Sequence, residues 1–329
     1  MDKPQHIVIS RTDNIGDVVL TLPMAALLKQ KYPHIKVSFL ARDYVKSIIS
    51  ACPDVDAFIS WDGLRSLDER SAIDTLRDLQ IDAIIHVFPQ KKIAKLAKAA
   101  KINWRIGSSH RWYHWVSCNQ RIDFSRKNSS LHEAQLNLQL LQPFNLPNNL
   151  TLVQLQDLLH LHKCERPGVK IKSLLAMDRF NLVLHPLTNG NTEEWPLSKF
   201  SALIKALPEE RFNIIVSGTA NEKERLQPLL KQYPNVQDAV GTLSLATFID
   251  LLSCANGIVA NSTGPMHLAA ALGIHVLGLF PEVKGKDIGR WLPLGEKAEV
   301  LSAASIDLIS LDRVLQIITN WQNESDARN

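Results

Sequence analysis

The loop at residues 11–23 has residue types that suit proton transfer. It reads R-T-D-N-I-G-D-V-V-L-T-L-P, beginning with Arg11. Gly16 permits a tight turn where a ligand comes close. Asp17 falls in the first turn of a predicted helix, where a carboxylate either stabilises the helix dipole by about 0.3–1 kcal/mol or serves as a general base. Position alone leaves both interpretations open, although Asp13 and Asn14 can cap the helix and leave Asp17 for function.

The loop within residues 257–273 gives the strongest indication of an anion site. Ser262 and Thr263 can cap the helix that follows, Gly264 permits close approach of a ligand, and Pro265 suits the first helical position. Because backbone N–H groups at a helix N-terminus bind anions, we predict a diphosphate here in preference to a merely well-capped helix. His267 lies one turn into this helix, where a single histidine more often packs or supports a ligand than catalyses.

A third loop, in residues 185–196, is a weaker candidate for anion binding. Its small polar residues have backbone N–H groups that could face an anion, but a tight strand–helix connection has the same composition. These residues are Thr188, Asn189, Gly190 and Asn191. No metal site is predicted, because the histidines and acids lack ligand spacing. Neither G-x-G-x-x-G nor the P-loop sequence occurs, which argues against a dehydrogenase or a P-loop NTPase.

The segment from Ala83 to Ile122 is strongly basic, with eight Lys and Arg residues and no acidic residue. Five of these are lysines within residues 91–101 and cover about half of a predicted helix. An aromatic stretch, R-W-Y-H-W, follows at residues 111–115. Basic and aromatic residues together favour an anionic, membrane-embedded partner over a solvated face or a nucleic acid, for which no recognised motif is present. The residues assigned to acceptor or membrane contact are Arg11 and Gly16 of the first loop together with Lys91, Lys92, Lys95, Lys98 and Arg111.

Alternating apolar runs and helix-period segments must position these loops. Predicted strands lie at 6–10, 36–41, 56–60 and 82–88, and in a second series at 180–186, 212–218, 257–261 and 275–280. Predicted helices lie at 18–30, 44–50, 71–79, 91–101, 132–141, 197–207, 221–233, 265–272 and 306–321. This alternation predicts an α/β protein with two Rossmann-like, doubly wound parallel-sheet domains, residues 1–160 and 161–329. Ligands bind beyond the carboxyl ends of such strands, so the default site is a cleft between the domains.

The composition agrees with a globular protein of two domains. The chain has 329 residues, of which 45% are hydrophobic and 21% charged. No apolar run approaches the ~20 residues of a membrane span, and the N-terminus lacks the pattern of a signal peptide, so we expect a cytoplasmic protein. The four cysteines are isolated, which indicates reduced thiols in place of a zinc site or a disulfide framework.

The motifs together resemble glycosyltransferase family 9, the ADP-heptose:lipopolysaccharide heptosyltransferases. The resemblance runs from the loop at 11–23 through R-I-G at 105–107, L-H-E-A-Q-L-N at 131–137, H-P…W-P at 185–196 and G-T-A-N-E at 218–222 to S-T-G-P-M-H at 262–267 and R-W-L-P-L-G at 290–295. It implies a GT-B fold and an inverting, metal-independent transfer of heptose from ADP-heptose, with no cofactor besides this co-substrate. The acceptor would be the Kdo or heptose of the lipopolysaccharide inner core, at the cytoplasmic face of the inner membrane.

The same resemblance assigns roles to individual residues and to the two domains. Asp17 would be the general base in an acceptor-binding first domain, and the second domain would bind the donor. There Ser262, Thr263 and Gly264 would meet the diphosphate and sugar, Glu222 the ribose and Leu243 the adenine. The C-terminal helix is expected to pack back on the first domain.

Two positions depart from the family pattern. Glu193 stands where many members have a Lys or Arg that binds the diphosphate, so another cation must do that work; the candidates are Arg11, Lys199, Lys284, Lys286 and Arg290. Ser262 stands where better-known members have Asp, a sugar contact, which leaves the donor sugar open. The alternatives are therefore a family-9 transferase with a different donor, an inactive sugar-nucleotide-binding protein, or a GT-B epimerase, although the basic segment speaks against the last.

Overall fold

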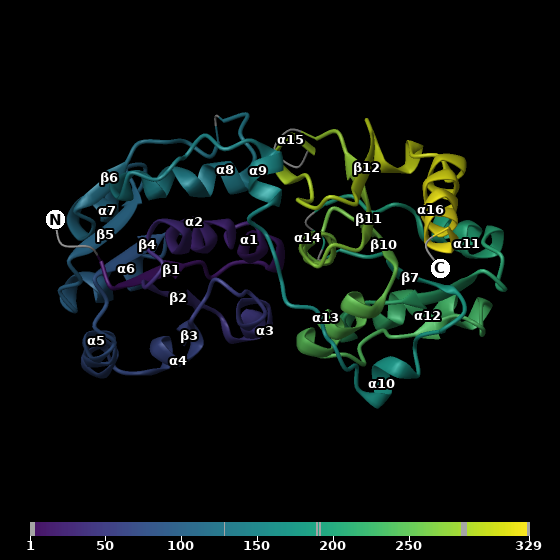
Figure 1. The fold of residues 1–329 in the computed structure, drawn as a ribbon, viewed down its shortest axis with the longest axis horizontal. Coiled ribbons are helices and arrows are strands. Elements are labelled where there is room, and N and C mark those ends of the chain that lie inside the picture. The colour runs from purple at the N-terminus through teal and green to yellow at the C-terminus, as the bar shows by residue number, and fades with distance from the viewer. Residues whose placement is uncertain (1–3, 128, 189, 191, 284–287, 328–329) are drawn as a thin grey trace. The chain divides into compact units, whose positions relative to one another are not determined.

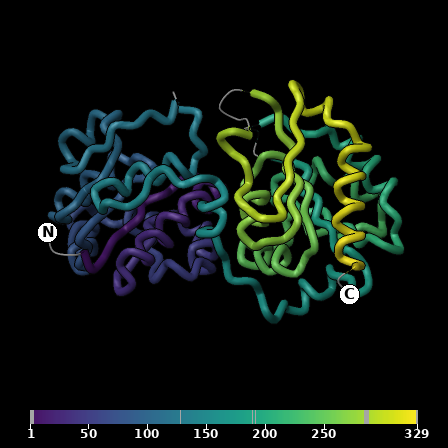
Figure 2. The backbone as a smooth tube through the Cα atoms, turned by 45° about the horizontal axis from the view of Figure 1, so that its top comes forward, coloured from purple at the N-terminus to yellow at the C-terminus, as the bar shows by residue number. Residues whose placement is uncertain are grey.

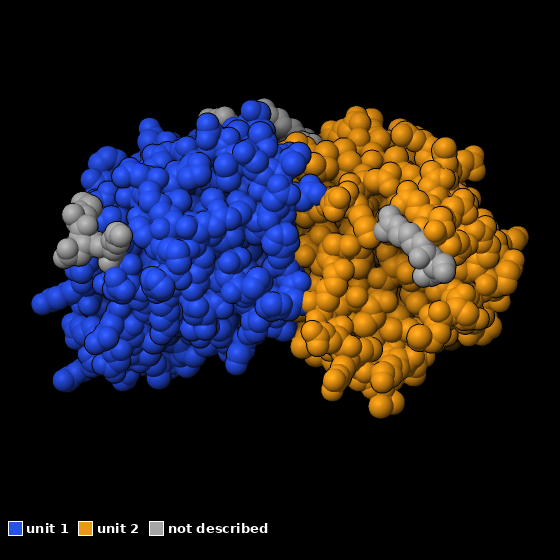
Figure 3. All heavy atoms as spheres, in the orientation of Figure 1, with its two compact units in different colours: residues 1–162 blue, residues 163–329 orange. Residues whose placement is uncertain are grey.

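The computed structural model describes residues 4–127, 129–188, 190, 192–283 and 288–327. The chain forms two compact units, residues 1–162 and 163–329 (Figure 3). Each unit is built on one six-stranded, fully parallel sheet. The predicted pair of doubly wound α/β sheets is therefore confirmed.

The sheet of the first unit has the strand order β3-β2-β1-β4-β5-β6 (Figure 1). Its strands are β1 His6–Ser10, β2 Lys36–Ala41, β3 Ala57–Ser60, β4 Ala83–His86, β5 Trp104–Ser108 and β6 Gln120–Ile122. Ser10 pairs in register with Leu40 of β2 on one side and His86 of β4 on the other. The chain order reverses between β1 and β4, and their carboxyl ends form the switch point at which open α/β sheets bind ligands.

Helices cover this sheet and bury its strands. They are α1 Ile15–Val19, α2 Pro23–Lys31, η1 Asp43–Val45, α3 Lys46–Ser50, α4 Trp61–Ser66, α5 Glu69–Asp78, α6 Lys91–Ala99, α7 Trp112–Ser117, α8 Glu133–Leu138, η2 Gln139–Phe144 and α9 Leu152–Gln156. Val8, Leu40 and Ile84 from three adjacent strands pack with Ile93 and Leu96 of α6. The apolar runs of the strands are thus buried between helices, as expected of parallel sheets.

The single helix predicted at 18–30 is wrong, because the structure divides this segment into α1 and α2. Pro23 has no N–H to donate to the carbonyl of Val19, and the N–H of Leu22 takes that carbonyl at 3.1 Å. The helical hydrogen bonding is therefore interrupted, and Pro23 opens α2 at a position that tolerates proline. The short helix that remains, α1, carries Gly16 and Asp17.

The second unit repeats the topology of the first, with the strand order β12-β11-β10-β7-β8-β9. Its strands are β7 Phe180–His185, β8 Phe212–Val216, β9 Gln237–Asp238, β10 Gly257–Asn261, β11 His275–Pro281 and β12 Ala298–Ala303. The chain order reverses between β7 and β10, which are direct neighbours. The loops that follow these two strands are two of the three loops selected from the sequence.

The helices of the second unit include the C-terminal one. They are α10 Val169–Lys172, α11 Leu197–Ala206, η3 Ala220–Glu222, α12 Lys223–Gln232, α13 Leu245–Cys254, α14 Gly264–Ala271, α15 Ile288–Trp291, η4 Ile306–Leu308 and α16 Leu311–Asp326. Figure 2 shows α16 in yellow near the end of the chain. Its residues Val314, Ile318 and Trp321 join the core of the second unit, so its apolar side is used within that unit. None of the helices in the described residues is long and apolar enough to cross a membrane.

Candidate functional site

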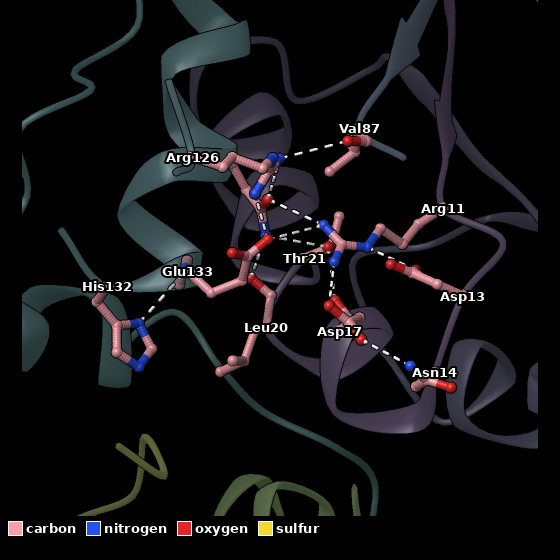
Figure 4. A network of polar contacts seen from close by, with 12 residues as sticks. Arg11, Asp13, Asn14, Asp17, Leu20, Thr21, Val87, Arg126, His132 and Glu133 are labelled. Atoms are coloured by element: carbon pink, nitrogen blue, oxygen red, sulfur yellow. Dashed lines mark hydrogen bonds and ion pairs between the residues drawn. The ribbon is translucent and has the colours of Figure 1, made fainter. Parts of the chain in front are cut away.

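A buried arginine organises the loop after β1. Arg11 follows Ser10, is only 3% exposed, and its Nε donates to Asp13 Oδ1 at 2.7 Å. Its Nη1 donates to Glu133 Oε1 at 3.1 Å, and its Nη2 forms an ion pair with Asp17 (Figure 4). A guanidinium cannot lose its proton in this setting, so it fixes the positions of three carboxylates at the switch point of the first sheet.

Helix α8 holds this arrangement from the opposite side. Glu133 and Asn137 are one helical turn apart on α8, and both are almost fully buried. Asn137 Oδ1 accepts from Arg11 Nη1 at 3.1 Å, and its Nδ2 donates to the carbonyl of Leu20 at 3.0 Å. Arg126 adds a second cation, bound to Glu133 and, at 2.9 Å, to Asn137 Oδ1. The motif at 131–137, which had no assigned role, therefore fixes the loop that carries Asp17.

Asp17 does not cap its helix. Its carboxylate binds Arg11 through Oδ1 and lies 3.4 Å from Asn14 Nδ2 through Oδ2. Asn14 occupies the N-cap position of α1 but makes no side-chain capping bond, and Asp13 is bound to Arg11. Of the two predicted cap candidates, Asn14 takes the N-cap position, but the expected side-chain capping bond is absent from this described cap, and Asp13 is held by the buried guanidinium instead.

The environment of this loop raises the pKa of one carboxyl group, that of Asp13. Burial raises the pKa of Asp13 to about 6; Arg11 acts in the opposite direction, and Asp17 adds to the increase. Burial disfavours the charge of Arg11, but the surrounding carboxylates raise its pKa above the usual value. Asp13 is thus a second carboxylate at this site that titrates near the working pH of most enzymes, and no local pattern in the sequence indicated it.

Unpaired polar atoms also gather beside this loop. Both ring nitrogens of His86 and the hydroxyl of Ser10 are buried without a hydrogen-bond partner within the described part of the chain. The two residues are register partners on β1 and β4, so their side chains leave the same face of the sheet. Burial, aided by the nearby His114 and Arg105, lowers the pKa of His86 to about 3. The imidazole is therefore neutral at the switch point.

In the second unit, one asparagine joins the two switch-point loops. Asn261, the last residue of β10, is fully buried. Its Oδ1 accepts from the backbone N–H of Trp195 at 3.0 Å, and its Nδ2 donates to the carbonyl of Pro186 at 2.5 Å. Trp195 is itself fully buried and donates from Nε1 to the carbonyl of Ile309 at 3.1 Å. The loop after β7 is therefore fixed beside the start of α14.

The N-cap residue of α14 makes no side-chain capping bond. Thr263 is the N-cap residue, but its hydroxyl donates to the carbonyl of Asn261 at 3.1 Å, so this described cap leaves the helix N–H groups without a side-chain acceptor. Ser262 is half-buried and donates its backbone N–H to Leu279. The helix begins at Gly264, which puts Pro265 in the second helical position, one later than predicted. His267 is buried, and its ring packs against that of Trp291.

The loop after β7 is closed by a carboxylate. Glu194 Oε1 accepts from the backbone N–H of Thr188 at 2.8 Å and from its hydroxyl at 3.1 Å. That hydroxyl also accepts from the N–H of Gly190, whose φ of +75° is one that glycine adopts readily. Arg225 pairs with Glu194 at 2.5 Å and so lies beside this loop. This cation was not predicted from the sequence. The predicted residues Asn189 and Asn191 lie outside the described residues.

The two residues assigned to the nucleoside lie on loops of the same unit. Glu222 is buried, and its Oε2 accepts from the N–H of Thr219 at 2.6 Å in a capping box. Leu243 is half-buried, directly before Ser244, the N-cap of α13. Glu222 therefore has one structural contact already, and Leu243 has apolar surface to offer.

The structure explains why residue 193 is acidic. Glu193 Oε2 accepts from the N–H of Ile306 at 3.2 Å, so it caps η4. Among the candidate cations, Lys199 donates to the carbonyls of Asp307 and Ile309, and Arg11 is enclosed by acids in the first unit. Lys284 and Lys286 lie outside the described residues. Arg290 lies 5.6 Å from the ring centroid of Trp291, and the Trp291 ring packs on His267 of α14.

The predicted basic residues are on the surface of the first unit. Lys91, Lys92, Lys95 and Lys98 are exposed along α6, and Arg111 is the exposed N-cap residue of α7. Gly16, by contrast, is buried in α1. In the described residues, no group of three or more His, Cys, Asp or Glu side chains is arranged to hold a metal ion.

Comparison with known proteins identifies the family. Residues 70–314 match the model of glycosyltransferase family 9 (heptosyltransferase). The chain belongs to glycosyltransferase family 9. This family-9 enzyme is 25% identical to a Haemophilus influenzae protein named in general terms as a candidate glycosyltransferase, over 98% of this chain and 99% of that one.

Solved structures agree with the fold of this family-9 enzyme. The ADP-heptose lipopolysaccharide heptosyltransferase II of Escherichia coli matches with a TM-score of 0.79 and 19% identity, over 98% of this chain and 99% of that one. The E. coli heptosyltransferase WaaC with ADP matches with a TM-score of 0.71 and 19% identity, over 96% and 99% of the two chains. At these identities the likeness establishes the GT-B fold.

Proposed function

We propose that this family-9 enzyme transfers heptose from ADP-heptose to a Kdo or heptose residue of the lipopolysaccharide inner core, with inversion and without a metal ion. The E. coli relatives support this choice, since one is named for ADP-heptose and lipopolysaccharide and the other was solved with ADP. The second unit, residues 163–329, would bind the donor, and the first would bind the acceptor. The acceptor is carried on a lipid, so the enzyme would work at the cytoplasmic face of the inner membrane.

The observation that carries the proposal is the environment of Asp17. Its carboxylate is held by Arg11 and lies near Asn14, and it makes no capping bond to α1. A carboxylate fixed by a buried guanidinium at a switch point is poorly explained by helix stability alone. It is well placed for proton transfer at the edge where sheets of this kind bind ligands.

The reaction follows from this placement. The acceptor hydroxyl attacks the anomeric carbon of the donor while the bond from that carbon to the diphosphate oxygen breaks. The proton of the hydroxyl passes to Asp17, most directly to Oδ2, because Oδ1 is bound by Arg11. Direct displacement from the opposite side inverts the anomeric configuration. A general base of this type contributes about 10²–10⁴ in rate.

The leaving ADP needs its negative charge stabilised. In the second unit, the uncapped first turn of α14 would supply backbone N–H groups, and Ser262, Thr263 and Gly264 would contact the diphosphate. Arg290 is the described cation that we assign to the role that Glu193 leaves vacant, because its neighbour Trp291 packs on α14. Glu222 would bind the ribose and Leu243 the adenine.

A panel of nucleotide sugars tests the reaction. Purified enzyme would be incubated with each donor and with deacylated inner-core acceptors, and the product would be analysed by mass spectrometry. We expect turnover with ADP-heptose, and a loss of ~10²–10⁴ in kcat for Asp17→Asn with ADP affinity retained. Asp78→Asn, which removes an exposed carboxylate on α5, is the matched control and should leave kcat unchanged.

Three results would contradict the proposal in different ways. Preference for another nucleotide sugar would reject heptose as the transferred group while leaving the glycosyltransferase assignment intact. ADP binding without transfer to any acceptor would indicate an inactive sugar-nucleotide-binding protein. A folded Asp17→Asn variant with full activity would reject Asp17 as the base.

A further inference from the structure

Helix α7 turns its apolar side outward. Trp112, Trp115 and Val116 are 67%, 61% and 62% exposed, whereas His114 and Ser117 of the same helix are buried. Because the three exposed side chains follow an i, i+3, i+4 spacing, they share one face of the helix. Two neighbouring tryptophans and a valine left in solvent form the kind of apolar patch that marks an interaction surface.

Cations flank both indole rings. Lys91 of α6 lies 4.7 Å from the ring centroid of Trp112, and Arg121 lies 4.8 Å from that of Trp115. Helix α6 packs on α7 (Figure 1), and its exposed residues Lys92, Lys95 and Lys98 extend the positive surface. The indole N–H of Trp115 donates to the carbonyl of Ser109 at 2.9 Å, which fixes the ring in its outward position.

The charge balance of this surface is strongly positive. The exposed acids at its margin include Glu69, which shares a surface hollow with the lysines of α6, and Asp123, which pairs with His110. Between residues 83 and 122, however, the sequence has no acidic residue at all. The partner of this surface must therefore combine negative charge with an apolar layer into which indole rings can enter.

We propose that α7 and the lysine side of α6 form the surface by which this enzyme binds an anionic phospholipid bilayer. The indoles of Trp112 and Trp115 enter the interfacial layer, where tryptophan is enriched in membrane proteins, and Val116 follows them. The amines of α6 and the guanidinium of Arg121 bind lipid phosphates. The inference rests on the proposed function in one respect, which is that a lipid-borne acceptor gives the enzyme a reason to bind a membrane.

A second copy of the chain suits this surface poorly. In a twofold dimer, the same patch faces itself, so the cations around Trp112 would lie against their own copies. Like charges brought together at an interface disfavour association. An anionic bilayer offers phosphate groups for the cations and an acyl layer for the exposed apolar side chains.

Vesicle binding by the full chain tests the proposal. Vesicles of phosphatidylglycerol and phosphatidylcholine would be sedimented with the protein, and tryptophan fluorescence would be followed with brominated lipid as a quencher. We expect binding to anionic vesicles only, with quenching. The double variant Trp112→Ser/Trp115→Ser should bind about tenfold more weakly for each indole lost. Replacing Lys91, Lys92 and Lys95 by Gln should weaken binding by roughly fivefold for each lysine.

Matched controls separate this surface from general effects. Val169→Ser/Met177→Ser removes apolar side chains that are even more exposed, from the second unit, and should leave binding unchanged. Lys223→Gln/Lys231→Gln removes exposed lysines from α12 and should also have no effect. Melting temperatures of all variants establish that each one is folded.

Several outcomes would overturn the inference. The first two are vesicle binding by the double tryptophan variant at the parental level and an absence of vesicle binding by the parent. The other two concern the partner: dimers of the parent formed through α7 and detected by light scattering, or binding of single-stranded RNA, but not vesicles, through this surface. An assay of transfer to a water-soluble, deacylated acceptor tests the proposed function independently of membrane binding. The double tryptophan variant should retain that activity even where it no longer binds vesicles, so loss of one property does not decide the other.

Discussion

At the scale of single residues, Arg11 is the centre on which the first site is built. It is buried, and it binds Asp13, Asp17 and Glu133, while Arg126 supplies a second cation to Glu133. Removing one partner from such a group leaves an uncompensated buried charge, which is costly, so the arrangement tolerates little change. The proposed general base, Asp17, is thus held in place by a network of buried charges.

Asp13 should make the stability of the enzyme depend on pH. Its pKa is raised to about 6 in the folded protein, mainly by burial, against an ordinary value of 3.8. Between these two pH values the folded state binds more protons than the unfolded state, so the free energy of unfolding falls as pH rises. Asp13→Asn removes this titration. From pH 5 to pH 7.5, the free energy of unfolding of the variant should therefore fall by about 1 kcal/mol less than that of the parent.

Urea unfolding at the two pH values measures this difference. The comparison of one variant across pH cancels the effect of the new amide on packing, because the amide is neutral at both values. Asp78→Asn on α5 serves as the exposed control. Parallel pH dependences of the parent and Asp13→Asn would show that Asp13 ionises normally.

At the scale of elements, Asn261 joins two loops that are far apart in sequence. Asn261→Ala leaves the N–H of Trp195 and the carbonyl of Pro186 buried without their present partner. Each unpaired group costs about 1–3 kcal/mol, so the variant should lose roughly 2–6 kcal/mol of stability. ADP affinity should fall as well, because the loop after β7 is no longer fixed beside α14.

Chemical unfolding and calorimetric titration with ADP check this prediction. The control Asn235→Ala alters an exposed asparagine before β9 and should change neither quantity. An Asn261→Ala variant with parental stability and ADP affinity would mean that the two loops are held by other contacts.

The elements also show what the sequence can predict. The buried strands were predicted closely because parallel strands are continuous apolar runs, as at 6–10, 36–41 and 257–261. The six-residue α7 and three-residue β6 were missed, since periodicity needs more length than they have. Asp17 was selected from its loop, but its contacts with Arg11 and, through Arg11, with Glu133 depend on a pairing across 122 residues that no local pattern reports.

At the scale of the whole molecule, the described residues give each of the two units a core cluster of its own. In the second unit Phe180, Trp195 and Phe200 pack with Trp321 of α16, and in the first Val8 and Ile84 pack with α6. Units with their own cores can undergo local unfolding independently of each other. A ligand that binds one unit therefore stabilises that unit first.

ADP should slow hydrogen exchange in the second unit selectively. A ligand at 100 times its dissociation constant stabilises its binding state by about 2.7 kcal/mol, or roughly 100-fold in the opening equilibrium. We expect this protection in residues 163–329, and most strongly in α14 and the loop after β7, because these carry the proposed diphosphate contacts. Peptides from residues 4–127 should exchange at nearly unchanged rates. Mass spectrometry of the full chain with and without ADP measures both regions in one sample, with AMP as a ligand that lacks the diphosphate. Equal protection by AMP and ADP at matched saturation would reject the proposed diphosphate site at α14. Protection confined to the first unit would show that the nucleotide binds at the switch point of the first sheet.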